Sequence, residues 1–377
     1  MNTVKILHCA DMHIGAAESF LGISAENRRF ETLVTFEKIV DLCQEKGVQI
    51  LAIAGDLFDS NDIEDRFIDA VFTKIASIKD VKVVFSAGNH DPLNSQSPFL
   101  TREIPENLYV LGVKDECITF DDLKVRVWGR SFENNFLKGE ERFSLSVPQD
   151  DYINIMVQHG ELKSDLNSEY NAITPQFVLN SGMDYIALGH VHKRSDIGKL
   201  GNVRFAYSGC PEGQGFDELD QKGVFVGDIG KDFCELEFLP VSHRLHIHKK
   251  IDISSFSDSG EISSHILKTL AEEYGEDFSK NLYKIELIGS ISPETELSLP
   301  EITSRIKDKV YFVKLKDSTK ILLDLETLSK EASLKGIFVK KMSEKINEAD
   351  ESQKPLLEKA LQLGLKAFSS EVKYSED

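Results

Sequence analysis

The sequence predicts an α/β fold in which two β-sheets pack face to face as a sandwich flanked by helices, followed by a smaller C-terminal α+β domain. Three observations support this fold class. Strand-like runs alternate with helical stretches near the start, a dense series of further strand-like runs follows, and the composition changes after residue 241. We therefore expect a first domain at 1–241, a small α+β capping domain at 242–325 and C-terminal helices at 326–377.

The first three strand-like runs predict a parallel sheet. They are rich in Val, Ile and Leu: "VKILHCA" (4–10), "VQILAIAG" (48–55) and "VKVVFSAG" (81–88). The stretch 26–47 between the first two has apolar residues at three- and four-residue spacings and ends at Gly47, as a helix does. A strand, a helix and a second strand in this order form a parallel β-α-β unit.

The next runs predict the second sheet. Six short segments have the composition of strands: 124–129, 152–157, 184–189, 203–209, 223–229 and 234–241. Because most of them are not separated by a long helix, we expect them to form one further sheet that packs on the first.

The rest of the chain predicts the C-terminal α+β domain and its helices. A Ser- and Asp-rich link at 252–264 precedes a helix and two strands, at 282–291 and 309–315. The last helix, 354–368, repeats apolar residues on one side. These residues are Leu357, Leu361, Leu365 and Phe368. Such a stripe packs more often on its own domain than on a partner.

The charge of the chain limits the classes of function. The formal net charge is -19, so the composition shows no basic face for coating nucleic acid. Phosphate chemistry in such a protein needs local positive charge, which bound metal ions supply. The five cysteines contain no CxxC pair, which disfavours a disulfide framework or a structural zinc site. Signal-peptide features and an apolar run of membrane-spanning length are both missing, so we expect a cytoplasmic protein with no membrane association.

Polar side chains follow five of the predicted strands, where open α/β sheets place their ligands. They are Asp11 and His13 in "DMH", Asp56 and Asp59 in "GDLFD", Asn89, His90 and Asp91 in "GNHD", His159 and Glu161 in "QHGE", and His190 and His192 in "GHVH". Taken singly, an Asp or Asn after a strand is more often a turn residue or a helix cap. Imidazole together with carboxylate and amide oxygens suits Mn, Fe or Zn.

The number of candidate ligands indicates how many ions are bound. Seven side chains qualify: Asp11, His13, Asp56, Asn89, His159, His190 and His192. Seven are too many for one ion that must also keep a position open for water and substrate. Two ions that share one carboxylate would use all of them. Such a pair, roughly 3.5–4 Å apart, lowers the pKa of a bridging water and stabilises both reacting oxygens at phosphorus.

The order of these motifs resembles that of the calcineurin-like metallophosphoesterase family: D-x-H, G-D, G-N-H-D/E, H and G-H-x-H. Within this family the chain is similar to the SbcD-type exonuclease subunits of DNA double-strand-break repair complexes. The start "VKILHCADMHIG", the motif "GDLFD" and the segment "YSGCPEG" (207–213) carry the closer resemblance. The family resemblance covers about residues 3–240 and implies the two-sheet metallophosphoesterase fold.

The resemblance implies a role for each polar residue. The implied assignment is Asp11, His13 and His192 on one ion, Asn89, His159 and His190 on the other, and Asp56 bridging the two. His90 would contact the substrate phosphate or protonate the leaving oxygen, with Asp91 orienting its ring and raising its pKa. The alternative for His90 is a brace that supports the metal ligands.

The resemblance also implies an activity and partners. We expect a Mn-dependent DNA exonuclease, with endonuclease activity as a further option, in which a hydroxide activated by two metals attacks phosphorus. The expected partners are DNA, an SMC-like ATPase of the SbcC type that docks on the C-terminal helices, and a second copy of the chain. The dimer would form through helices after Asp62 or Asn94.

Two other functions stay open. A phosphodiesterase or phosphatase for small nucleotides fits the acidic charge, and a non-catalytic metal-binding scaffold would be expected to have lost a ligand. Among nearby residues, Asp59 is expected to be a loop or helix-cap residue. Cys210 is expected near the site, where it could bind a soft metal or oxidise, and His8 is expected to be buried in the first strand.

Overall fold

The computed structural model describes residues 2–18, 21–22, 25–137, 143, 145–292, 295–322 and 325–369. Its contacts divide the chain into two compact units, Met1–His246 and Ile247–Asp377. The division lies a few residues after the predicted boundary at 241. The further division at 325 stays a prediction, and the last residues of the predicted C-terminal segment, 370–377, lie outside the described residues.

The first unit contains a six-stranded sheet with the N-terminal strand inside it. In spatial order the strands are β14 (Phe233–Pro240), β13 (Gly223–Gly230), β1 (Thr3–Cys9), β2 (Ile50–Ile53), β3 (Lys82–Phe85) and β4 (Leu108–Val110). Strands β1 to β4 run parallel, as the β-α-β pattern predicts. Strand β13 pairs antiparallel with β1, and β14 pairs antiparallel with β13.

The position of β13 and β14 corrects the sequence prediction. The sequence assigns the runs at 223–229 and 234–241 to the second sheet, whereas the structure places both in the first. The two strands form an antiparallel hairpin, and β13 covers the side of β1 that β2 leaves open. This pairing satisfies backbone N–H and C=O groups that would otherwise form an exposed sheet edge.

The second sheet also has six strands. In spatial order they are β11 (Gly198–Leu200), β12 (Val203–Tyr207), β10 (Tyr185–Gly189), β7 (Ile153–His159), β6 (Val125–Gly129) and β5 (Glu116–Phe120). The four inner strands are parallel and the two edge strands are antiparallel to their neighbours. A separate pair of short strands, β8 (Glu161–Leu162) and β9 (Ala172–Ile173), follows β7 in sequence.

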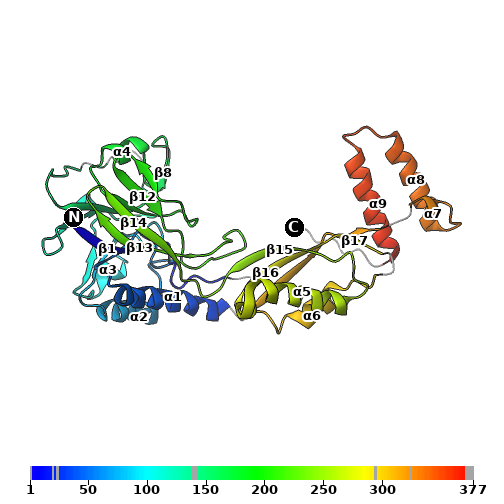
Figure 1. Ribbon diagram of the computed structural model, residues 1–377, viewed down its shortest axis with the longest axis horizontal. Coiled ribbons are helices and arrows are strands. Elements are labelled where there is room, and N and C mark those ends of the chain that lie inside the picture. Colours follow the sequence, from blue (N-terminus) through cyan, green and yellow to red (C-terminus); the bar gives the residue numbers. More distant parts are fainter. Residues whose placement is uncertain are drawn as a thin grey trace. The chain divides into compact units, whose positions relative to one another are not determined.

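The two sheets pack face to face, and helices cover their outer faces (Figure 1). Alternate residues of β1 point to opposite sides: Val4 and Ile6 lie between the sheets, and Leu7 and Cys9 lie under the helices. The helices on the first sheet are α1 (Ala25–Lys46), α2 (Asp65–Ala76) and α3 (Pro98–Thr101), and α4 (Pro175–Asn180) lies on the second. Each buried Leu or Ile contributes about 1.5–3 kcal/mol. The predicted sandwich flanked by helices is confirmed.

The second unit is a smaller α+β structure, as predicted. Its main sheet has the order β15 (His246–Asp252), β16 (Leu282–Ile288) and β18 (Phe312–Asp317). The other elements are α5 (Ser259–Tyr274), the 3-10 helix η2 (Gly275–Lys280), β17 (Ser290–Ile291), α6 (Leu299–Ile306), β19 (Lys320–Ile321), α7 (Leu325–Ser329), α8 (Leu334–Glu348) and α9 (Lys354–Ser369).

The apolar stripe predicted on the last helix is partly buried within its own unit. Leu361 and Leu365 of α9 form a small core with Val339 of α8 and Ile321 of β19. Phe368, at the end of the stripe, is 48% exposed. Among the described residues, none of the helices combines the length and apolar character needed to cross a membrane.

Candidate metal centre

The predicted polar residues meet where the parallel strands of both sheets end. Asp11, Asp56 and Asn89 follow β1, β2 and β3, whose parallel registers bring their carboxyl ends to one edge of the first sheet. His159 is the last residue of β7, and His190 follows the neighbouring strand β10 in the second sheet. Because the sheets pack face to face, both contribute side chains to one cluster.

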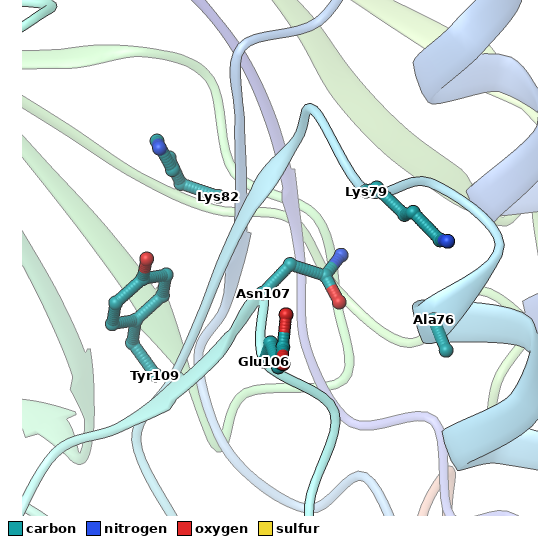
Figure 2. A pocket seen from close by; sticks show the side chains of 6 residues that line it. All are labelled: Ala76, Lys79, Lys82, Glu106, Asn107 and Tyr109. Carbon is teal, nitrogen blue, oxygen red and sulfur yellow. The ribbon is translucent and has the colours of Figure 1, made fainter.

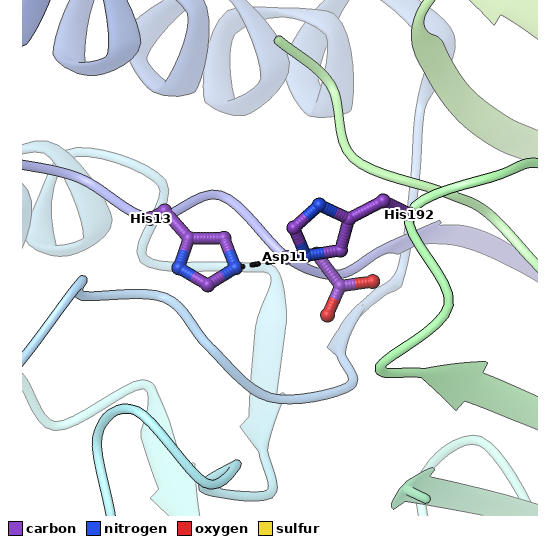
Figure 3. A group of neighbouring side chains, drawn as sticks. All are labelled: Asp11, His13 and His192. Atoms are coloured by element: carbon purple, nitrogen blue, oxygen red, sulfur yellow. Dashed lines mark hydrogen bonds between the residues drawn. The ribbon is translucent and has the colours of Figure 1, made fainter. Parts of the chain in front are cut away.

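One group in this cluster consists of Asp11, His13 and His192 (Figure 3). Their potential ligand atoms lie within 4.8 Å of one another, and Nε2 of His13 is 3.1 Å from Nε2 of His192. Oδ1 of Asp11 accepts a hydrogen bond from the backbone N–H of His190 at 2.9 Å. Asp11 and His13 are buried, whereas His192 is partly open to solvent. A small cation could therefore contact all three side chains.

A second group consists of Asp11, Asp56 and His159, again with ligand atoms within 4.8 Å of one another. Nε2 of His159 is 3.3 Å from Oδ2 of Asp56 and 2.9 Å from Oδ1 of Asn89. The same oxygen of Asn89 is 3.2 Å from Nδ1 of His190. The second group is thus continuous with the two ligand candidates that follow β3 and β10.

Asp56 connects the two groups. Its Oδ2 atom lies 3.7 Å from Nε2 of His13 and 3.3 Å from Nε2 of His159. Burial would raise the pKa of the Asp56 carboxyl, but the imidazoles of His159 and His13 hold it well below its usual value. The carboxylate is therefore ionised and lies where one side chain can contact two ions.

The donor atoms fit divalent cations. Nδ1 of His159 lies 2.9 Å from the carbonyl oxygen of Ala54, which can only accept, so Nδ1 carries the ring proton. In the neutral ring, Nε2 then presents a lone pair to oxygens of Asp56 and Asn89 that are themselves acceptors. Burial would lower the pKa of His159, but the Asp56 carboxylate raises it to about 9. The proton that the charged ring carries on Nε2 removes the repulsion between Nε2 and these oxygens. A cation bound between them would do the same.

The backbone is strained at four of the candidate ligands. Asp11, His13, Asp56 and His190 have positive φ angles of 54°, 47°, 51° and 97°. Non-glycine residues avoid this region, at a cost on the order of 1–3 kcal/mol each. Neighbouring backbone holds the loops in place: Asp11 N–H donates to the carbonyl of Gly55 at 3.0 Å, and His13 N–H to that of Asp56 at 2.9 Å. Strain of this kind clusters at ligand sites.

Two glycines allow the close approach of the strand ends. A Cβ atom on Gly189 would lie 1.8 Å from the carbonyl oxygen of Ala54 in the facing sheet. A Cβ atom on Gly88 would lie 2.1 Å from Oδ1 of Asp56. No larger residue fits at either position, so glycine directly before His190 and Asn89 sets how closely the ligand loops can meet.

The structure gives Asp91 a role different from the predicted one. Asp91 is fully buried, and burial together with the nearby Asp56 carboxylate raises its pKa to about 6. Its two oxygens accept four backbone hydrogen bonds, from Gly88, Asp56, Leu57 and Phe58. The expectation that Asp91 orients the ring of His90 is wrong, because these oxygens are turned to the backbone. Asp91 instead ties the loop after β2 to the loop after β3.

Asp59 is the residue that contacts His90. Nδ1–H of His90 donates to the carbonyl oxygen of Asp59 at 3.0 Å, and the Asp59 carboxylate lies 3.8 Å from the same nitrogen. That carboxylate is also 3.2 Å from Nδ1 of His13. The side chain of His90 is 44% exposed. Asp59, which the sequence assigns to a loop or helix cap, therefore supports two imidazoles, and Nε2 of His90 is the atom able to exchange a proton with a bound molecule.

Glu218 is a further partner that sequence reasoning missed. Its Oε1 accepts from Nδ1–H of His192, which turns Nε2 of that ring toward the cluster. Burial would raise the pKa of Glu218, but the His192 imidazole lowers it to about 2. Oε2 accepts from the thiol of Cys210 at 3.3 Å, so this cysteine lies beside the site. Glu218 is in a loop with no strand or motif to mark it, and no sequence signal identifies it.

Figure 2 shows a cavity lined by Ala76, Lys79, Lys82, Glu106, Asn107 and Tyr109, none of which belongs to the metal cluster. It has a volume of about 440 Å³ and lies at the N-terminal ends of β3 and β4, at the opposite end of the first sheet from Asn89. The side chain of Asn107 donates to the carbonyl oxygens of Ile75 and Ile78. Asn107 thus satisfies backbone carbonyl groups at the C-terminal end of α2.

Comparison with known proteins identifies relatives over most of the chain. The family model described as calcineurin-like phosphoesterase matches residues 4–194, a little over half of the chain. The DNA double-strand break repair protein Mre11 of Methanopyrus kandleri is 24% identical over 324 residues, covering 79% of this chain and 67% of that protein. Mre11 of Sulfolobus acidocaldarius is 23% identical and covers 76% of each chain.

Two further similarities are more limited. The uncharacterized metallophosphoesterase YhaO of Bacillus subtilis is 26% identical, with coverage of 62% of this chain and 60% of that protein. The solved structure of TT1561 of Thermus thermophilus aligns with a TM-score of 0.40 at 12% identity, covering 63% of this chain and 99% of that one.

Proposed function

Because this chain belongs to the calcineurin-like phosphoesterase family, we propose that it is a metal-dependent phosphodiesterase that acts on DNA, as the exonuclease subunit of an SbcC-SbcD-like repair complex. The observation that carries the proposal is the assembly of all seven candidate ligands, with His90 beside them, at the carboxyl ends of the two sheets. A scaffold that had lost catalysis would be expected to lack part of this set.

We assign the ligands to two divalent ions. The assignment is Asp11, His13 and His192 to one ion, Asn89, His159 and His190 to the other, and Asp56 to both. The mixed imidazole, carboxylate and amide donors favour Mn, with Fe or Zn as alternatives. When bound, such ions neutralise charge on phosphoryl oxygens and lower the pKa of a water so that it is a nucleophile near neutral pH.

His90 has the geometry of the proton donor to the leaving oxygen. The hydrogen bond from Nδ1–H to the Asp59 carbonyl fixes the ring, and the Asp59 carboxylate lies 3.8 Å from the same nitrogen. The exposed side chain allows Nε2–H to reach a strand bound over the cluster. A general acid so placed contributes about 10²- to 10⁴-fold to the rate.

The extent of the similarity supports DNA as the substrate. The similarity to the M. kandleri repair protein covers 79% of this chain, which is more than the first unit, Met1–His246, so the likeness continues into the second. A hydrolase of small nucleotides has less need of a second unit. The second candidate is such a hydrolase, and the net charge of -19 favours it.

The first experiment compares two substrates. Metal-stripped protein with Mn restored is given linear DNA or a bis-aryl phosphodiester, using wild type and His90→Ala. We expect DNA cleavage by the wild type, and its loss in the variant with metal content unchanged. Turnover of the small diester without DNA cleavage, also after addition of the ATPase, would favour the second candidate. No turnover of either substrate with two ions bound would contradict phosphodiesterase activity.

Helices α8 and α9 are the proposed docking surface for the SMC-like ATPase. Their exposed large apolar side chains are Leu334 (78%), Ile337 (54%), Leu356 (71%), Leu363 (44%) and Phe368 (48%). Replacing Leu334 and Leu356 with Glu should abolish co-purification with the ATPase, whereas Lys340→Gln on the same helix should not. Retained binding in the Glu variant would refute this assignment.

A homodimer is proposed through α2 and α3. Leu100 on α3 is 60% exposed. Its replacement by Glu should halve the mass measured by light scattering, and a monomeric wild type would refute the dimer.

A further inference from the structure

We infer that a phosphate-binding subsite lies beside His192, formed by Lys222 with Lys193 and Arg194, and that it holds the backbone of a nucleic-acid strand next to the metal cluster. This inference rests on the proposed function, because it names the part of the substrate that a small phosphodiester lacks. It concerns residues outside the seven candidate ligands.

The subsite is a cavity of about 350 Å³ that His192 helps to line. His192 lines it, so the cavity adjoins the cluster, with room for a phosphate group and water. The charged residues in the lining are Lys193, Arg194, Asp220 and Lys222. With three cations and one carboxylate, the lining has a net positive charge in a chain whose own net charge is -19.

Lys222 is the residue that marks the cavity as an anion site. Its exposure is only 6%, and Nζ donates to the carbonyl oxygen of His192 at 3.2 Å. Among the residues that the structure describes, no carboxylate pairs with it. A buried ammonium group without a counter-ion is costly, and such groups are normally paired. An anion entering the cavity would supply the missing charge and accept the remaining N–H groups.

Lys193 and Arg194 provide a second cationic edge. Both are exposed, and within the described part of the chain neither forms an ion pair. The guanidinium of Arg194 lies 4.2 Å from the ring centroid of Phe238, so stacking rather than a carboxylate orients it. Two unpaired cations directly after a metal-ligand candidate are suited to the phosphate adjacent to the one being cleaved.

A structural role for Lys222 makes different predictions. The carbonyl that it contacts also accepts the backbone N–H of Cys210 at 3.1 Å, so Lys222 could act only by holding the His192 loop. In that case its replacement would reduce metal binding and the turnover of every substrate alike. A phosphate subsite instead affects a strand selectively and changes the salt dependence of binding.

The experiment measures binding of a fluorescent single-stranded oligonucleotide with phosphorothioate linkages, in the presence of Mn, as a function of salt. The variants are Lys222→Met and the double variant Lys193→Gln/Arg194→Gln. The matched control is Lys79→Gln/Lys82→Gln, which removes the same charge at the cavity on the opposite end of the first sheet. Metal content and Trp128 fluorescence are recorded for each variant to confirm an intact site and fold.

The double variant should bind about 10-fold more weakly than wild type, because charged phosphate contacts contribute this much or more. The slope of log K against log salt should fall by about 1.4, the value for two lost contacts to a single strand. The ratio of DNA cleavage to bis-aryl diester turnover should fall in parallel. The control should match the wild type in all three measurements.

Weaker binding with a smaller salt slope in the double variant alone supports the subsite, even if Lys222→Met does not fold. Equal effects in the control, or an unchanged salt slope in the double variant, would overturn it. It would also be overturned if inorganic phosphate alone displaced the strand at a concentration below that of the strand's own phosphates. Failure of the wild type to hydrolyse either substrate would contradict the proposed function separately, because the binding measurement needs no turnover.

Discussion

Lowering the pH from 7 to 5 should destabilise the first unit by about 2 kcal/mol through one buried histidine, His8. His8 lies in β1 with no exposed surface. Its Nε2 is 3.1 Å from the carbonyl oxygen of Leu188, and its Nδ1 is 2.9 Å from the hydroxyl of Tyr185. The carbonyl can only accept, so Nε2 carries the proton and Nδ1 accepts from Tyr185. This neutral ring links the first sheet to β10 of the second.

The magnitude follows from the pKa of this ring. Burial lowers the pKa of His8 from 6.5 to about 3, and the hydrogen bond to Leu188 opposes the shift only in part. The unfolded chain takes up a proton near pH 6.5, whereas the folded chain does so near pH 3. The stabilisation is therefore complete above pH 6.5 and is lost as the pH falls toward 3. At pH 5 the loss corresponds to about 1.5 pH units, or about 2 kcal/mol.

The assay is urea unfolding followed by tryptophan fluorescence. Trp128 is the only tryptophan and lies on β6, so it reports on the first unit alone. EDTA is included so that metal binding does not contribute. The wild type should lose about 2 kcal/mol more than His8→Gln between pH 7 and 5. His248→Gln, an exposed control, should behave as wild type, and equal losses in wild type and His8→Gln would refute the reasoning.

Three further substitutions test the supports of the metal cluster. Glu218→Gln should lower Mn affinity about 10- to 100-fold, because the partner that orients a ligand imidazole is weakened; calorimetry with unchanged affinity would contradict this. Asp91→Asn should destabilise the first unit by about 2–6 kcal/mol in the same fluorescence assay, because the amide leaves two backbone N–H donors without an acceptor. Asp62→Asn, on the surface nearby, should be neutral. Gly189→Ala should prevent folding of the first unit, because its Cβ would lie 1.8 Å from the Ala54 oxygen; a native circular dichroism spectrum would show that the sheets can separate.

The sequence was sufficient to predict, for most segments of the first unit, which form helices and which form strands. It was not sufficient to predict which strands pair with each other. Strands β1, β2 and β3 are nearly continuous apolar runs, because both of their faces are buried. The run at 223–229 has the same character, and burial alone does not say which strand it pairs with. Strand β5, Glu116–Phe120, was not predicted because it is an edge strand with a mixed burial pattern, which resembles a loop.

In the site, the ligand candidates could be predicted and their supports could not. Motif order indicated the seven candidates because each follows a strand at a fixed position. Asp59 and Asp91 both lie near His90, and sequence proximity favoured Asp91. The loop geometry decided otherwise: Asp91 turns inward to four backbone N–H groups, and Asp59 turns toward two imidazoles. Glu218 reaches its histidine only through the fold, so a sequence pattern does not reveal it.

Three of the seven candidate ligands, His159, His190 and His192, come late in the chain, and this has a consequence during its synthesis. Asp11 and His190 are 179 residues apart, and β1 is flanked by a strand that begins only at Gly223. At about 5–20 residues per second, a ribosome needs roughly 10 to 40 s between the first and last ligands. Throughout that interval the emerging N-terminal half holds Asp and His side chains without their partners from β7 and β10. The nascent chain is therefore unable to form the complete cluster until most of the first unit has left the ribosome.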